Sequence, residues 1–271
     1  LVMIKLFKTY SPFSIAIIKQ NYLAYRSRFM LWTIANAITL LVQIFLWISI
    51  FDDSPNTIIN GFSKQMMINY VIFSKIIESV TFISIEQQVA SDLKRGSIVN
   101  SFTKPINYEF ELLFKALGSI IGSTIIFTPI YLIILFIFNM NGFNMNFITL
   151  LFFILHLFIA LALNYVIGLF FASMLFKTIK HNGVYEIKKI LIMFLSGALF
   201  PINFYPQFLS KTLEYMPFIF VRYVPTKILL GKMTVNEMLF SLLMGVSWCF
   251  IIYILAILLW KQMIKQITIF G

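Results

Sequence analysis

Residues 187–231 read IKKILIMFLSGALFPINFYPQFLSKTLEYMPFIFVRYVPTKILLG. The segment starts as an apolar helix behind two lysines and is interrupted at Gly197 and Pro201. The roughly fifteen residues before Pro201 are too few to cross a hydrocarbon core of about 30 Å, because an α-helix rises only about 1.5 Å per residue. The aromatic and mostly apolar run that follows contains three further prolines, Pro206, Pro217 and Pro225.

This interrupted stretch predicts a membrane segment that does not cross in one piece. Lipid cannot satisfy free backbone N–H and C=O groups, so irregular segments lie at membrane depth only where protein buries them. We therefore expect a short membrane helix at 187–202, followed by a re-entrant outer element at 203–231 near one membrane face. The rest of the chain is expected to position this element.

The composition places the chain in a membrane. Hydrophobic residues make up 60% of it and charged residues 11%, with a mean hydropathy of +0.92, whereas soluble domains have roughly 45–50% apolar and about 25% charged residues. The net charge of +11 does not indicate nucleic-acid binding. Its basic residues lie in short loops between apolar runs, where membrane orientation and anionic lipid explain them. The single cysteine, Cys249, excludes a disulfide framework.

We expect an all-α integral membrane protein, with an interfacial helix at 1–28 and a single transmembrane domain at 29–271. The N-terminal segment mixes basic, aromatic and aliphatic residues without an acid, as interfacial helices do, and its aromatic residues argue against a disordered basic tail. A hydrophilic segment at 86–116, broken by Gly96 and Pro105, predicts short helices along the cytoplasmic surface. Six stretches are the expected spans: 29–51, 66–85, 117–138, 147–176, 187–202 and 238–260.

The distribution of Lys and Arg predicts that both termini are cytoplasmic. Most of the 21 basic residues lie in the N-terminal segment, in 86–116, in 177–189 and at the C-terminus, which share one side of this topology. The other side carries only Lys64, Lys211, Arg222, Lys227 and Lys232. The Pro-rich element at 203–231 then faces outward.

Four polar residues inside the expected spans are candidates for a function: Lys75, Glu78, His156 and Asn164. Lys75 and Glu78 are three positions apart, so they share a helix face and can pair. Charges within a membrane usually mark function, but we favour a structural ion pair that fastens this span to its neighbours. For His156 we favour hydrogen bonding between helices over a proton site, because its span contains no carboxylate.

Several kinds of chemistry have no motif here. The sequence lacks a GxxxxGK[ST] phosphate loop, an HExxH or CxxC metal motif and a nucleophile elbow. It also lacks a TVGYG-like ion filter and an obvious inverted repeat. We therefore expect a chain that is not an enzyme and that binds neither a metal nor a cofactor of its own.

Three stretches together resemble the ABC-2 type permeases, and more narrowly the small bacterial branch that pairs with separate ATPase subunits. They are NYLAYRSRFMLWTIANAI at 21–38, EQQVASDLKRGSIVNSFTKPIN at 86–107, and LSGALFPINFYPQFLSKTLEYMPFIFVRYVPTKILLGK at 195–232. The resemblance covers nearly the whole chain and implies a six-span fold of the type V exporter kind. The second stretch has Phe102 and Thr103 where this branch often has leucines.

The resemblance also implies roles for particular residues. The region that couples to the ATPase would contain Asp92, Lys94, Arg95, Gly96, Lys104 and Pro105. The outer re-entrant gate would contain Gly197, Pro201, Pro206 and Pro217. The implied partners are two ABC ATPase subunits carrying ATP and Mg²⁺, a second permease copy or a paralogue, and membrane lipids.

The function expected from this resemblance is ATP-driven export of a hydrophobic or amphipathic cargo across a bacterial cell membrane. A drug, as in multidrug resistance, an antimicrobial peptide or a lipid-like molecule would suit the Phe- and Met-rich spans. The alternatives are a polysaccharide or lipid exporter and a non-transport assembly or sensor subunit. An ion-coupled carrier ranks last, because Glu78 is the only acid in the middle of an expected span.

Overall fold

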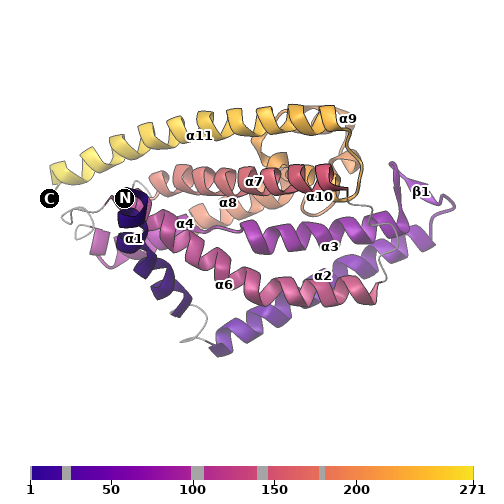
Figure 1. The fold of residues 1–271 in the computed structure, drawn as a ribbon, viewed down its shortest axis with the longest axis horizontal. Helices are drawn as coiled ribbons and strands as arrows, with labels where there is room; N and C mark the ends of the chain where they lie inside the picture. Colours follow the sequence, from indigo (N-terminus) through magenta and orange to yellow (C-terminus); the bar gives the residue numbers. More distant parts are fainter. Residues whose placement is uncertain (1, 20–25, 99–106, 139–145, 177–180, 271) are drawn as a thin grey trace.

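The computed structural model describes residues 2–19, 26–98, 107–138, 146–176 and 181–270 (Figure 1). These residues form an elongated bundle of helices with one two-stranded hairpin. The longer helices are α1 (Val2–Ile18), α2 (Arg26–Asp52), α3 (Lys64–Thr81), α4 (Ile85–Lys94), α6 (Tyr108–Ile137), α7 (Phe147–Met174), α8 (His181–Leu195) and α11 (Val235–Phe270). The shorter elements are β1 (Ile58–Ile59), β2 (Phe62–Ser63), η2 (Ile202–Phe204), α9 (Gln207–Leu213), η3 (Pro217–Val221) and α10 (Tyr223–Leu229).

Four of the described helices are long and apolar enough to cross a membrane: α2, α6, α7 and α11. A fifth crossing is possible if α3 and α4, which meet at a bend of 41°, form one broken span. The segment expected as the fifth of six spans, 187–202, corresponds to α8, whose 15 residues are too few to cross alone. By length and composition, four or five of the described helices or helix pairs can cross a membrane, and the count of six stays a prediction.

The helix that contains the expected third span, 117–138, is longer than that span. Helix α6 begins at Tyr108. The Asn107 side chain accepts a hydrogen bond from the Glu109 N–H, 2.8 Å away, and caps the helix. Glu109 and Glu111 then place negative charge in the first turn, where the helix dipole favours it. The later part of the segment expected as short surface helices therefore belongs to α6.

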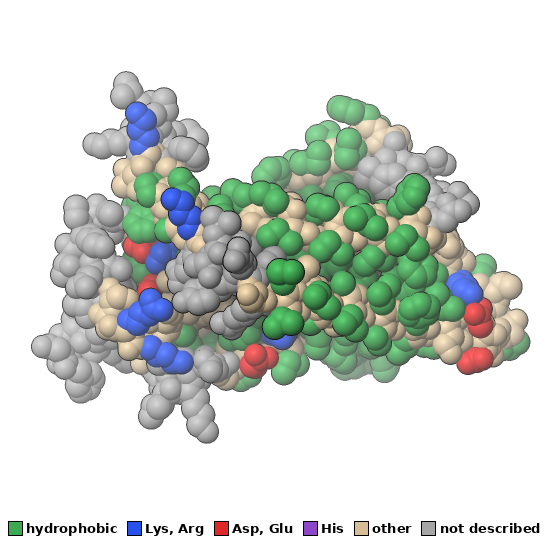
Figure 2. Space-filling view, turned by 90° about the horizontal axis from the view of Figure 1, so that it is seen from below, with side chains coloured by type: hydrophobic (Ala, Val, Ile, Leu, Met, Phe, Trp, Pro, Cys, Tyr) green, Lys and Arg blue, Asp and Glu red, His purple; other side chains and the backbone are tan. Residues whose placement is uncertain are grey.

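The two termini lie at the same end of the molecule, and the hairpin and α9 lie toward the other (Figure 1). Between these ends the surface is broadly apolar, while most charged side chains visible in Figure 2 lie toward the ends. Large apolar side chains stand exposed on this surface, including Leu31, Ile125 and Phe136, which is 88% exposed. Such a belt fits contact with lipid rather than with water.

The N-terminal helix packs onto the start of α6. The Ser14 hydroxyl donates to the Phe114 carbonyl at 2.5 Å, and the Tyr10 hydroxyl accepts from the Asn107 N–H at 3.0 Å. A Cβ added at Gly118 would lie 2.5 Å from the Ser14 carbonyl oxygen, so only glycine permits this approach. Helix α1 is therefore held by α6 and is not an independent tail.

A hairpin closes the opposite end. Asn60 and Gly61 form its turn with positive φ angles of 47° and 81°, the backbone that an Asn-Gly hairpin turn requires. The Lys232 ammonium donates to the Gly61 carbonyl and lies 4.1 Å from the centre of the Phe62 ring. These contacts tie the hairpin to the turn between α10 and α11.

Candidate functional site

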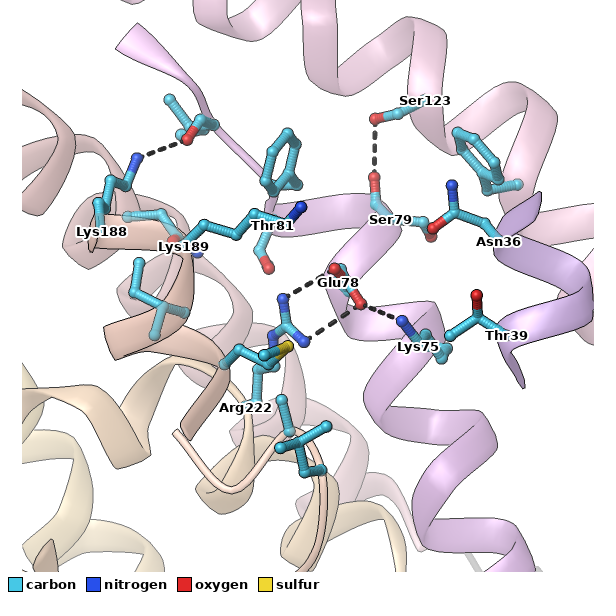
Figure 3. Close-up of a pocket in the computed structure, with 18 of the residues that line it drawn as sticks. Asn36, Thr39, Lys75, Glu78, Ser79, Thr81, Ser123, Lys188, Lys189 and Arg222 are labelled. Atoms are coloured by element: carbon cyan, nitrogen blue, oxygen red, sulfur yellow. Dashed lines mark hydrogen bonds and ion pairs between the residues drawn. The ribbon is translucent and has the colours of Figure 1, made fainter. Parts of the chain in front are cut away.

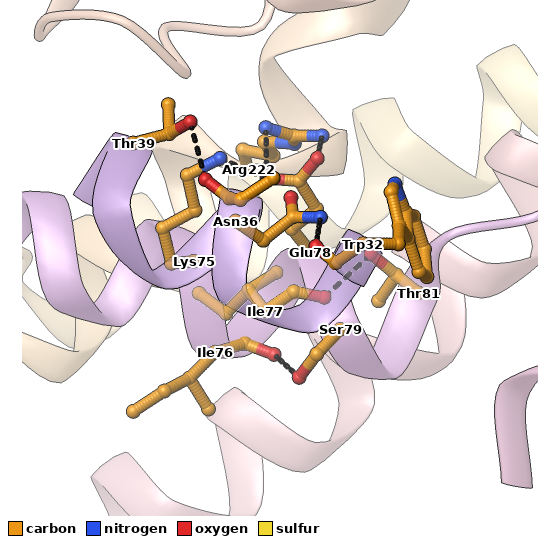
Figure 4. Close-up of polar contacts among 11 residues, drawn as sticks. Trp32, Asn36, Thr39, Lys75, Ile76, Ile77, Glu78, Ser79, Thr81 and Arg222 are labelled. Carbon is orange, nitrogen blue, oxygen red and sulfur yellow. Dashed lines mark hydrogen bonds and ion pairs between the residues drawn. The ribbon is translucent and has the colours of Figure 1, made fainter. Parts of the chain in front are cut away.

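A break in a membrane helix forms the centre of the candidate site. Helix α3 ends at Thr81, Phe82 takes an extended backbone, and α4 begins at Ile85. Near the break, the Ser79 and Thr81 hydroxyls donate back to the Ile76 and Ile77 carbonyls, each at 2.7 Å (Figure 4). Hydroxyls that bond to their own helix in this way favour bending.

Glu78, just before the break, is held by two cations. Lys75 Nζ lies 2.9 Å from Glu78 Oε2, so the pair expected from the sequence is present. Arg222, between η3 and α10, adds a second pairing, with Nη2 3.0 Å from Glu78 Oε1 and Nη1 3.1 Å from Oε2 (Figure 3). The three side chains form a charged cluster that joins α3 to the outer element.

Glu86, just after the break, is held by α8. Lys188 Nζ lies 2.9 Å from Glu86 Oε2 and donates to the Ile83 carbonyl at 2.7 Å. The Glu86 and Lys188 side chains are only 1% and 4% exposed. Lys188 thus satisfies a backbone carbonyl that the break leaves outside a helix, and it neutralises the buried carboxylate beside it.

A cavity of about 230 Å³ lies against both charged groups (Figure 3). Helix α2 lines it with Trp32, Asn36, Thr39 and Gln43, which recur every three or four residues and so share one helix face. The Asn36 amide donates to the Trp32 carbonyl at 2.8 Å, so part of its polarity is satisfied within α2 (Figure 4). The cavity therefore combines a polar helix face, two carboxylates and their cations inside an otherwise apolar bundle.

The other two polar residues predicted within spans have different positions. His156 is fully buried, and its Nε2 lies 2.9 Å from Ser241 Oγ on α11. Its Nδ1 lies 2.7 Å from the Phe152 carbonyl oxygen. This is the hydrogen bonding between helices that the sequence favoured. Asn164 on α7 instead lines the cavity and is 5% exposed.

The residues predicted to form the outer gate lie at turns of the broken element. Gly197 follows α8 with φ +75°, a backbone that favours glycine. Its carbonyl accepts from the Tyr70 hydroxyl at 2.6 Å, which ties the end of α8 to α3. Pro201 and Pro206 immediately precede η2 and α9, and Pro217 is the first residue of η3. Such positions suit proline, because a first-turn N–H has no partner within its helix.

The residues predicted to couple to an ATPase divide into two groups. Lys94, Arg95 and Gly96 are exposed at the end of α4. Asp92 is instead buried, and its carboxylate accepts from the Tyr108 hydroxyl at 2.8 Å and lies 3.6 Å from Lys115 Nζ. Asp92 therefore holds α4 against α6 and is not exposed beside Lys94 and Arg95, and its role in ATPase coupling stays a prediction. The remaining two, Lys104 and Pro105, lie outside the described residues.

Three members of the site were not assigned to it from the sequence. Arg222 was counted among the outer-loop cations, but it is 8% exposed and bonds to a carboxylate 144 positions away. Glu86 and Lys188 lie at the edges of hydrophilic segments, and no role was predicted for either. One feature of the sequence could have indicated these residues. The chain has only ten acids, and an acid next to an apolar run needs a cationic partner.

Comparison with known families agrees with this architecture. The family described as ABC-2 family transporter protein matches residues 37–271, which include both charged groups and the whole outer element. Among curated proteins, none matches the chain. The match covers most of the sequence, and the structure is all-α with several helices able to cross a membrane. This chain is therefore a member of the ABC-2 transporter family and forms the membrane component of an ABC permease.

Proposed function

We propose that this chain is the permease subunit of an ATP-driven exporter in a bacterial cell membrane. ATP hydrolysis takes place on two separate ATPase subunits, and a second permease copy or a paralogue completes the translocation path. The cargo is hydrophobic or amphipathic, such as a drug, an antimicrobial peptide or a lipid-like molecule. The observation that carries the proposal is the family match over residues 37–271.

The placement of exposed and buried residues supports different roles for the two ends of the molecule. The tip of α4, with Lys94, Arg95 and Gly96, is exposed and lies toward the end that holds both termini. We assign this end to the cytoplasm and to the ATPase, as the excess of basic residues there favours. The broken element 203–231 belongs to the outer face, where it closes the path.

The charged cavity supports a role in transport rather than in scaffolding alone. A stable scaffold needs no cavity of about 230 Å³ beside six charged side chains within the bundle, because unfilled space and buried charge both cost stability. Arg222 connects the cavity to the outer element, and α4 connects it to the exposed tip. A rearrangement at the break can therefore couple the tip of α4 to the gate.

The proposal is tested by the ATPase activity of the complete complex. The tagged chain is purified from its native host in a mild detergent, and ATP hydrolysis by the accompanying subunit is measured with and without candidate amphipathic cargoes. Hydrolysis that depends on this chain and increases with a cargo supports an exporter. Hydrolysis that is unchanged when the chain is absent, and that no cargo alters, contradicts the proposal and favours an assembly or sensor subunit.

A further inference from the structure

The walls of the cavity carry more positive than negative charge. Four cations line it, Lys75, Lys188, Lys189 and Arg222, against two carboxylates, Glu78 and Glu86. All ten Asp and Glu residues of the chain lie in the part that the structure describes, and only these two reach the cavity. With every group ionised, the walls have an excess of two positive charges.

The excess positive charge lies at two places, the Glu78 cluster and Lys189. Glu86 is paired with Lys188 alone, so that pair is neutral. Glu78 is shared by Lys75 and Arg222, which leaves one positive charge at a cluster whose three side chains are at most 27% exposed. Lys189 supplies the other, since the described residues give it no ion-pair partner. An uncompensated charge within a membrane is costly, so the cluster favours a bound anion.

Part of the remaining cavity wall is apolar. Trp32 on α2 and Phe127 on α6 meet edge to face with ring centroids 4.9 Å apart, and Phe82, Met193 and Leu199 also line the space. A volume of about 230 Å³ accommodates a small head group, because a water molecule takes about 30 Å³ in the liquid.

We propose that this cavity binds the anionic head group of an amphiphile, a phosphate or a carboxylate, with the apolar part of the molecule against Trp32 and Phe127. Lys75, Arg222 and Lys189 supply the positive charge that recognises the anion. As an assignment of cargo class, the inference rests on the exporter function proposed above, whereas binding of the anion does not depend on it.

Binding is tested with the full chain in nanodiscs of phosphatidylcholine, using radiolabelled dodecyl phosphate, dodecanol and dodecyltrimethylammonium as probes. The three share one tail and differ in head-group charge. We expect dodecyl phosphate to bind at least about tenfold more tightly than either of the others, as expected for a charge-assisted hydrogen bond. Equal binding of all three probes would overturn the proposal.

Variants locate the site. Lys75→Gln makes the Glu78 cluster neutral and is expected to weaken dodecyl phosphate binding about tenfold. Lys189→Gln removes an exposed lysine whose replacement does not disturb packing, and it is expected to weaken binding about threefold. Lys64→Gln is the matched control, because Lys64 is on the same helix and pairs with Asp52 outside the cavity. If Lys75→Gln and Lys189→Gln both bind as Lys64→Gln does, the assignment is wrong.

A transport assay distinguishes a transported cargo from a membrane lipid that only occupies the site. The complex with its ATPase is placed in vesicles, and ATP-dependent movement of dodecyl phosphate is followed. Movement that Lys75→Gln abolishes and Lys64→Gln preserves supports an anionic cargo. Tight binding without movement supports the site but contradicts its role in cargo recognition, and identifies a membrane lipid as the ligand. Absence of any ATPase subunit contradicts the exporter function and leaves the binding result to stand by itself.

Discussion

Glu78 connects α3 to the outer element through one carboxylate. It sits near the end of α3, accepts from Lys75 one turn earlier, and accepts from Arg222 in the outer element. Removing one partner of a buried ion pair lowers the stability of the fold by more than the intact pair adds to it. The reason is that the remaining charge is left without a counter-charge where water solvates it poorly. Glu78 is therefore expected to be essential to the fold of this region.

Replacing Glu78 by Gln should destabilise the protein strongly. The change leaves Lys75 and Arg222 facing each other without a counter-charge, at a cost of about 3 kcal/mol or more. Thermal unfolding in detergent measures the effect. Adding Lys75→Gln to Glu78→Gln should restore part of the stability, and Glu214→Gln, at an exposed position of the outer element, should have little effect. A double variant as unstable as Glu78→Gln alone would contradict this explanation.

Gly197 offers a second test at the scale of one residue. Its φ of +75° and that of Gly231, +67°, both favour glycine, but only Gly197 has close neighbours. A Cβ there would lie 2.9 Å from the Tyr70 hydroxyl oxygen, whereas at Gly231 nothing lies within 4 Å. Gly231→Ala should cost about 1 kcal/mol from backbone strain, and Gly197→Ala clearly more. Equal losses in thermal stability would show that the Tyr70 contact is unimportant.

At the scale of elements, α4 has a buried face and an exposed tip, to which we assign different roles. Its inner face is held against α6 by Asp92, Tyr108 and Lys115, and its exposed tip bears Lys94 and Arg95. On the proposed function, we expect a helix held in this way to move as a rigid unit between its tip and the break next to Glu86. Its two faces should therefore respond differently to mutation.

Arg95→Glu should weaken association with the ATPase subunit without changing thermal stability, because the side chain is exposed and its reversed charge opposes docking. Asp92→Asn should do the reverse: unfolding becomes easier by about 1–3 kcal/mol, since a buried charge-assisted hydrogen bond and a nearby lysine lose their partner. Pull-down and melting curves of both variants provide the comparison. Wild-type pull-down and transport by Arg95→Glu would rule out docking at this tip.

Sequence reasoning worked where it depended on composition or local spacing. Hydropathy identified α2, α6, α7 and α11, and the spacing of Lys75 and Glu78 was enough to predict their pairing. It failed where long-range approach decides the outcome. Nothing local distinguishes Arg222, buried against Glu78, from Lys227, which lies five residues later in α10 and makes no ion pair with Glu78. No local signal showed that Asp92 turns inward to Tyr108.

At the scale of the whole molecule, the apolar belt and the shared end of the two termini predict one orientation in the membrane. The single native cysteine makes this testable: Cys249 is replaced by Ala, and a cysteine is placed at exposed Gln207 in α9. A membrane-impermeant maleimide should label Gln207→Cys in intact cells. Arg95→Cys, the matched control, should react only after permeabilisation. Labelling of Gln207→Cys from the cytoplasmic side alone would invert the topology.

The central claim is that this chain works as the membrane partner of a separate ATPase. The most direct measurement is purification of the tagged full-length protein from its native host in a mild detergent, with mass spectrometric identification and quantification of every accompanying protein. We expect an ABC ATPase subunit in stoichiometric amount with the permease. Recovery of the chain alone as a clean, stable oligomer, from membranes in which such an ATPase is expressed, would contradict it.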